Sequence, residues 1–213
     1  MNVVRFRFRL TELTRTLASI AHEEGRLFQL NSVFINRDID SNGNEGLLAT
    51  TLRNTLLSSL EQKHHLGWNE DDAWKLPNDE AIEKALVDDE WAWVVVVAEE
   101  NATQRLISAR ENGDSSYNPS SAISIHYSQA RNEQAASLYT QIAQQLVEQA
   151  AIQAGIQLTQ SYLSSQSGNS TAIDLLSQAP STISNPFNPP RIVNVREYNQ
   201  TVANAITLVG LVR

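Results

Sequence analysis

Apolar residues recur every three or four positions along two long stretches of the chain, the spacing of one face of an α-helix. The first stretch follows Gly46 and is expected to end at Gly67, and the second runs from Glu133 to Ser165. Each therefore predicts an amphipathic helix. The apolar positions are Leu48, Leu52, Leu56 and Leu60 in the first helix, and Leu138, Ile142, Leu146, Ala150 and Ile156 in the second.

Strict alternation marks the N-terminal segment "VVRFRFRL", in which Phe6 and Phe8 share one face and Arg5 and Arg7 the other. This period of two predicts a short, half-buried strand. Thr11 is a suitable N-cap for a helix that follows and that ends or bends at Gly25. The arginines either blunt a sheet edge or meet acidic groups on a neighbour.

Two interpretations compete for the segment around Trp91–Val97, "WAWVVVV". Its composition has strand propensity, whereas the flanking stretches "DEAIEKALVDDE" and "AEENATQRLISAREN" look helical. No glycine or proline occurs between Asp79 and Asn112 to separate such elements. We therefore predict one or two long helices here, with the valines buried by tertiary contacts.

Prolines cluster near the C-terminus, where Pro180, Pro186, Pro189 and Pro190 favour an extended path. The segment beyond them is apolar again and is expected to be buried, in its own domain or in a neighbouring chain. The predicted fold is mainly α: a helical bundle with a short N-terminal β-strand and an extended C-terminal arm. The predicted division is a helical domain over 1–179 and the arm over 180–213.

Composition narrows the function classes. The 213 residues carry a net charge of −8, so the chain has no overall basic footprint for nucleic acid. Nine carboxylates lie between Glu70 and Glu90, either as a solvated acidic face or as a contact surface for a subunit. The longest apolar run falls far short of the roughly 20 residues of a membrane span, and no signal peptide is recognised. We expect a soluble, cytoplasmically made protein with no membrane partner.

The Glu133–Ser165 helix is poor in charge, with Glu148 as its only charged residue after Glu133. Its polar positions are mostly glutamine, whereas solvent-exposed helices usually carry lysine and glutamate. Such a helix suits packing on more than one side. A subunit interface and a buried central helix both fit this composition.

Two places in the sequence resemble metal-binding motifs. Asp38, Asp40, Asn42 and Gly43 occupy EF-hand positions, but Ala49 stands where the bidentate glutamate is needed. The Asp38–Gly46 loop is therefore interpreted as a turn made by Asx residues and a glycine. Glu61 and His64 have the spacing of a di-iron ligand pair, but the chain has no second such pair.

Catalytic motifs are also missing. The chain has no cysteine, no GxSxG and no phosphate-binding glycine loop, and His126 only has serines nearby in sequence. Four tryptophans near Asp71 and Asp72 suit a sugar site or, more simply, core and interface anchors. We predict no catalytic, cofactor-binding or metal residues, no cofactor, and no enzymatic activity. The alternatives are a small enzyme with a polar site in this Trp-rich acidic region, and a non-viral helical interaction module.

The order of elements resembles one family, the head-to-tail adaptors (tubular protein A type) of short-tailed phages. "LTRTLASIAHEE" looks like the first helix of that family, and "ATTLRNTLLSSLEQKHHLGW" like its second helix with a terminal Gly-Trp. "EWAWVVVVAEENATQRLISAREN" and the Gln-rich helix look like its later pair of long helices. The similarity covers roughly Leu10 to Ser165. The family's Gly-Glu-Pro turn is replaced here by "AHEE", and Asn31–Gly46 would be an insertion.

This resemblance implies a virion structural protein: a head-to-tail connector, in the neck or tail of a phage. It implies a homo-oligomeric ring of twelve copies that joins the portal protein to the tail nozzle or tail tube, with DNA passing through its channel. The C-terminal arm would dock on a neighbouring protein. The expected location is the virion, and the host cytoplasm during assembly.

Overall fold

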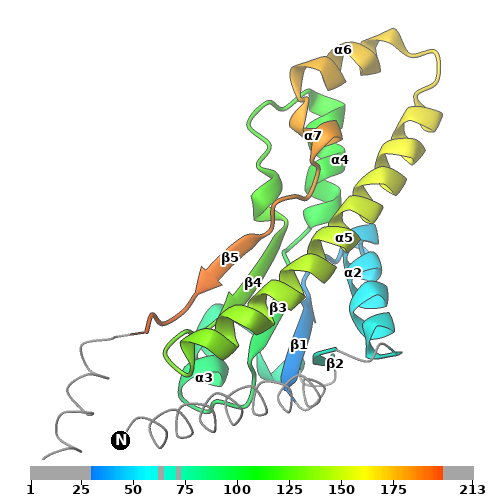
Figure 1. Cartoon of the computed structure of the whole chain (residues 1–213). Helices are drawn as coiled ribbons and strands as arrows, with labels where there is room; N and C mark the ends of the chain where they lie inside the picture. Colours follow the sequence, from blue (N-terminus) through cyan, green and yellow to red (C-terminus); the bar gives the residue numbers. More distant parts are fainter. Residues whose placement is uncertain (1–29, 62–64, 71–72, 199–213) are drawn as a thin grey trace, which may run out of the picture.

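Five strands form a mixed sheet at the centre of the computed structural model, which describes residues 30–61, 65–70 and 73–198 (Figure 1). The strand order is β2-β1-β3-β4-β5. β1 is parallel to both β2 and β3, β4 is antiparallel to β3, and β5 is parallel to β4. The strands are β1 (Asn31–Asn36), β2 (Gly67–Asn69), β3 (Val94–Ala98), β4 (Ile123–Tyr127) and β5 (Arg191–Asn194).

The predicted mainly-α bundle is therefore wrong, because the described residues form an α/β fold around this sheet. The helical interpretation of Trp91–Val97 failed because β3 lies between helices without any glycine or proline. Glu90 and Asn101 make the required turns instead, with φ angles of 50° and 52°. The valines of β3 are buried on both faces of the sheet, so their run shows no period of two.

Both helices predicted from periodicity are present, but the first does not extend to Gly67 as expected, because Gly67 begins strand β2. α2 (Leu47–Ser58) continues into a 3₁₀ turn over Ser59–Glu61, and α5 has the predicted bounds, Glu133–Ser165. α3 and α4 occupy the two stretches that looked helical on either side of β3. The remaining helical elements are α3 (Asp79–Val87), α4 (Ala102–Asn112), α6 (Ser170–Gln178), α7 (Ser181–Ser184) and the 3₁₀ turns Ala73–Lys75 and Pro119–Ser121.

Two cores lie on opposite faces of the sheet. On one face, Phe34 of β1 and Val94 and Val96 of β3 pack with the buried sides of α2, α4 and α5. On the other, Val33 and Val95 pack with α3. Alternate side chains of the same strands thus enter different cores, as the pleat requires. α5 is the largest element of the first layer and crosses the sheet diagonally (Figure 1).

The Pro-rich segment returns to the sheet. The chain beyond Pro180 forms α7 and then β5, whose residues Arg191–Asn194 pair with Ser124–Tyr127 of β4. This part of the predicted C-terminal arm is an edge strand of the same sheet. The predicted N-terminal strand, the helix that begins at Thr11 and the chain after residue 198 lie outside the described residues. No helix in the described part is long and apolar enough to cross a membrane.

Candidate protein interface

One side of α5 leaves large aliphatic side chains in contact with solvent. The exposed fractions are 44% for Leu138, 52% for Ile152, 51% for Ile156 and 49% for Leu163. The opposite side of the same helix is buried against the sheet and α2, through residues such as Ala143, Val147 and Ala150. α5 is therefore apolar on two sides, which explains why the sequence offered both an interface and a buried central helix.

The four exposed aliphatic positions fall on a longer row of residues that has the spacing of a coiled-coil seam, in which Ile142 and Thr159 are half-buried. Successive residues on this side lie alternately four and three positions apart over more than three heptads. This is the repeat by which one helix packs side chains between those of another. We call this set the outer seam: Leu138, Ile142, Gln145, Gln149, Ile152, Ile156, Thr159 and Leu163.

An apolar groove lies along one flank of the outer seam, between α5 and the chain around α7. It has a volume of about 210 Å³ and is lined by Ile152, Ile156, Ile183, Pro186 and other residues. Gly155 allows the close approach of its two walls, since a Cβ there would lie 2.6 Å from Cγ of Pro186. A partner side chain can enter this groove beside the exposed isoleucines.

Arg110 of α4 fixes the far wall of this groove. Its guanidinium is buried and donates hydrogen bonds to the carbonyl oxygen of Thr182, at 2.6 and 3.1 Å. It also donates to the carbonyl oxygen of Leu158 at 3.0 Å and to Oγ1 of Thr159 at 2.7 Å. Burial lowers the pKa of Arg110. One side chain thus joins α4, α5 and α7.

The other flank of the outer seam is a polar groove between α2 and α5, with a volume of about 430 Å³. Its lining has no charged side chain: Leu47, Thr50, Thr51, Asn54, Thr55 and Ser58 come from α2, and Gln149, Gln153 and Gln157 from α5. The threonine hydroxyls donate back to carbonyl oxygens one turn earlier, as in Thr51 to Leu47 at 2.7 Å. Their oxygens remain available as acceptors for a partner.

The Asp38–Gly46 loop does the work of a turn. Oδ1 of Asp40 accepts hydrogen bonds from the backbone N–H groups of Asn42 and Asn44, each at 2.8 Å, and Gly43 has a φ of +82°. The predicted Asx turn is thereby confirmed. The hydrogen bonds from Asn44 lower the pKa of Asp40. Within the described ranges, no group of three or more His, Asp or Glu side chains is placed to hold a metal ion.

Asp38 itself is buried and holds two helices at their starts. Its carboxylate accepts from the backbone N–H of Thr103 at 2.9 Å and from the Thr103 hydroxyl at 2.6 Å. The same hydroxyl oxygen accepts from the N–H of Leu48 at 3.2 Å. The first turns of α2 and α4 are thus tied to the end of β1, and Asp38 has a structural role.

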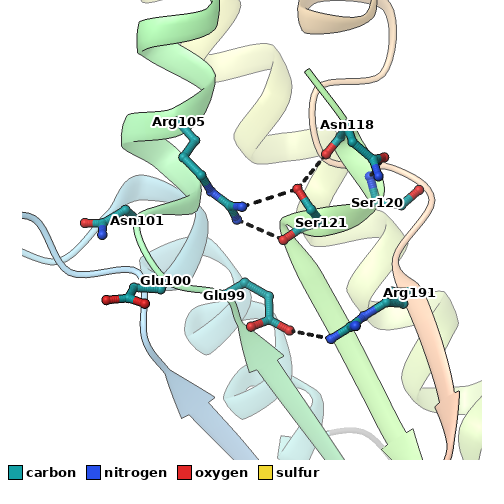
Figure 2. A pocket seen from close by; sticks show the side chains of 8 residues that line it. All are labelled: Glu99, Glu100, Asn101, Arg105, Asn118, Ser120, Ser121 and Arg191. Carbon is teal, nitrogen blue, oxygen red and sulfur yellow. Dashed lines mark hydrogen bonds and ion pairs between the residues drawn. The ribbon is translucent and has the colours of Figure 1, made fainter. Parts of the chain in front are cut away.

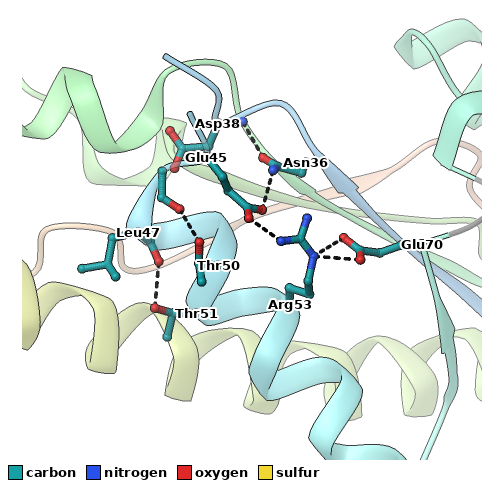
Figure 3. A network of polar contacts seen from close by, with 9 residues as sticks. Asn36, Asp38, Glu45, Leu47, Thr50, Thr51, Arg53 and Glu70 are labelled. Atoms are coloured by element: carbon teal, nitrogen blue, oxygen red, sulfur yellow. Dashed lines mark hydrogen bonds and ion pairs between the residues drawn. The ribbon is translucent and has the colours of Figure 1, made fainter. Parts of the chain in front are cut away.

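Beside this loop, Arg53 of α2 links two carboxylates (Figure 3). Its Nε contacts Glu70 at 2.6 Å, and its Nη1 contacts Glu45, which also accepts from Asn36. The carboxylate of Glu70 is therefore paired with a cation of the same chain. These ion pairs are partly exposed and connect β1, α2 and the chain after β2.

A wide, open hollow of about 600 Å³ lies at the end of the sheet where β3 ends and β4 and β5 begin (Figure 2). Glu99 and Arg191 form an ion pair across it at 3.2 Å, and Arg105 donates to the carbonyl oxygen of Ser121 at 2.8 Å. Two acidic and two basic side chains line it, so the hollow presents no net charge to attract a ligand of one sign.

His126 and Ser124 lie two residues apart on β4, and their side chains meet in the buried interior of the protein. Oγ of Ser124 lies 2.9 Å from Nε2 of His126 and donates to Glu99 at 2.5 Å. Both side chains are buried, and burial lowers the pKa of His126. A catalytic triad places histidine between serine and carboxylate, whereas here serine lies between the other two. This arrangement does not expose a nucleophile.

The four tryptophans do not form one cleft. Trp68 lies in the core beneath α2 and α5, whereas Trp91 packs against the core beneath α3, on the other face of the sheet. Trp93 stacks edge-on against Tyr139 of α5 with ring centroids 5.1 Å apart. They are mainly core anchors, although Trp74 is exposed. Asp71, Asp72 and His64 lie outside the described residues.

Tyr117, beside the apolar groove, should make the stability of the fold depend on pH. Its hydroxyl donates to the carbonyl oxygen of Pro186 at 2.6 Å, and burial raises its pKa to about 12. An unfolded tyrosine ionises near pH 10, so the folded state binds this proton more tightly and stability falls as the pH rises from 10 to 12. Thermal unfolding across this range should show that fall, and Tyr117→Phe should reduce its slope. An unchanged slope in the variant would contradict the assignment.

Comparison with known proteins gives one result. A model of a family described as "Protein of unknown function (DUF3533)" matches residues 8–213. No curated protein and no solved structure matches the chain.

Proposed function

We propose that this chain, which belongs to the DUF3533 family, is a non-catalytic assembly domain that binds a helix of another protein chain along the outer seam of α5. The observation that carries the proposal is the row of half-exposed aliphatic side chains at coiled-coil spacing. Single exposed leucines are ordinary on protein surfaces, but an extended row is typical of a binding surface. A helix laid into such a row is anchored at i, i+3, i+4 and i+7.

The energetics support a stable contact. Full burial of one leucine or isoleucine side chain contributes about 1.5–3 kcal/mol, so burying the exposed half contributes about 1 kcal/mol each. The four half-exposed residues of the outer seam together then supply about 4 kcal/mol. Association of two chains has its own entropic cost, so the flanking grooves must contribute as well. α5 carries little charge, and few ions need to lose water.

A role as a head-to-tail adaptor ring, with portal and tail-nozzle partners in a virion, is more specific than this proposal and stays a prediction. The resemblance behind it treats Glu90–Asn112 as part of a pair of long helices, and β3 occupies the middle of that segment. The outer seam equally suits an interaction domain outside any virus. We therefore propose assembly with another chain in general terms. A structural role in a virion would be one special case of such assembly.

A photoreactive side chain at position 156 tests the proposal in the cells from which the chain comes. Incorporated in place of Ile156, it should form a covalent adduct with another protein chain on irradiation. The same group in place of Ile173, an exposed isoleucine of α6 outside the outer seam, is the matched control and should form none. Ile152→Glu in the same chain should suppress the adduct. No adduct at position 156, or one that Ile152→Glu leaves undiminished, would contradict the proposal.

A further inference from the structure

We propose that the partner of the outer seam is a second copy of this chain, whose α5 runs parallel to the first and in register with it. This inference rests on the proposed function and names the partner. The helix can reach a second copy along its length, because exposed side chains of the outer seam occur from one end to the other, at Leu138, Ile152, Ile156 and Leu163. Between these ends the helix extends about 37 Å, at roughly 1.5 Å per residue.

Two glutamines choose the orientation. In a parallel, in-register pair, each seam residue faces its own counterpart. Gln145 then faces Gln145, and Gln149 faces Gln149. A glutamine amide both donates and accepts, so like amides satisfy each other. Ile152, Ile156 and the terminal leucines face identical apolar side chains.

The antiparallel arrangement is chemically mismatched. Centred on the outer seam, it places Gln149 opposite Ile152 and Gln145 opposite Ile156. Each amide is then covered by an apolar side chain and left without a partner, which destabilises the antiparallel pair. A central polar residue is a known means of fixing register in paired helices, at some cost in stability. We assign this role to Gln145 and Gln149.

Charge does not oppose the pairing of identical chains. Glu148 is the charged residue next to the outer seam, and its carboxylate accepts from Nε2 of Gln144 at 2.8 Å. In the parallel arrangement, heptad geometry places Glu148 opposite Gln153 of the second copy, not opposite its own counterpart. The flanking groove that holds Gln153 carries no charge. Like-charge repulsion across the two-fold axis is therefore avoided.

Disulfide trapping tests the orientation, and the chain suits it because it has no cysteine. Under mild oxidation, purified full-length chain with Leu163→Cys should form a covalent dimer, since parallel helices bring the two thiols together. An antiparallel pair would keep them about 37 Å apart. Mixed with a differently tagged Leu138→Cys chain, it should join position 163 only to position 163. Ile173→Cys is the control and should not cross-link.

Each outcome decides the inference. Disulfides that join position 163 to position 138 would overturn the parallel arrangement. If the mixture forms no disulfide at all, neither between like positions nor between positions 163 and 138, the second copy is overturned as partner. The adduct at position 156 in cells would still show whether α5 binds some other protein, so the two failures are distinguishable.

The role of the glutamines has its own readout. Gln145→Ile together with Gln149→Ile should strengthen pairing but remove the preference, so that disulfides between positions 138 and 163 appear beside those between like positions. Retention of parallel disulfides alone in this double variant would overturn the assignment of the glutamines.

Discussion

Replacing Arg110 by alanine is expected to lower the free energy of unfolding by about 4 kcal/mol. Hydrogen bonds from a charged donor contribute about 1.5–3 kcal/mol each, and the variant leaves the buried carbonyl oxygen of Thr182 without this donor. Three acceptors lose the guanidinium as donor: the carbonyl oxygens of Thr182 and Leu158 and the hydroxyl of Thr159. The ring of Tyr162, whose centroid lies 5.7 Å from the guanidinium carbon, also loses its cation. Urea unfolding followed by circular dichroism measures the change.

Arg105→Ala is the matched control for this prediction. Arg105 lies on the same helix but is exposed, and its contacts are to Ser121. Its loss should change stability by less than about 1 kcal/mol, as is usual for surface substitutions. Equal effects of the two substitutions would mean that Arg110 does not fasten α7 to α5. In that case the far wall of the apolar groove would have another support.

Gly46→Ala is expected to cost about 3 kcal/mol of stability, which is unusual for an added methyl group at the start of a helix. The new Cβ would overlap the carboxylate of Asp38 and lie 2.6 Å from Oγ1 of Thr103. Overpacking of this kind costs about 1–3 kcal/mol, and a displaced Asp38 would also stop capping α4, at about 1 kcal/mol. Thermal or urea unfolding measures the loss.

A double-mutant cycle separates this clash from general helix effects. Asp38→Ala removes the carboxylate that the new Cβ would overlap and leaves the Thr103 hydroxyl as its close neighbour, so Gly46→Ala should cost less in that background. The two free-energy changes should then sum to more than the change in the double variant. Simple additivity would contradict the close packing of Gly46 against Asp38.

The sequence predicts α5 and the start of α2 well because their signals are local. α5 has the predicted bounds since its periodic pattern is long and starts at a capping residue, Asn132, whose side chain accepts from the N–H of Ala135 at 3.0 Å. The turn after Asp38 was likewise predictable, because Asx residues bond to their own backbone.

The sheet could not be predicted in the same way. Its central strand is bounded by Glu90 and Asn101, which adopt positive φ angles without being glycine. β1 and β4 are short strands whose partners are remote in sequence, so no local pattern identifies their pairing. The error in fold class follows from treating the lack of glycine and proline as the lack of turns.

The candidate interface could be predicted from the sequence only in part. The low charge and glutamine content of α5 indicated packing on two sides, and the positions of the outer seam can be counted from the sequence. What the sequence lacks is the knowledge of which side faces the sheet. Only after Ala143, Val147 and Ala150 are placed against the core does the opposite row become a surface in need of a partner.

The central claim is that a second copy covers the outer seam, and sedimentation equilibrium of the purified full-length chain over a dilution series tests it most directly. The account predicts that the wild-type chain has a concentration-dependent mass above that of one chain. Ile152→Glu with Ile156→Glu should reduce it to the mass of one chain, whereas Ile173→Glu should leave it unchanged. A wild-type chain that stays at the mass of one chain, or a double variant that assembles as the wild type does, would contradict the account.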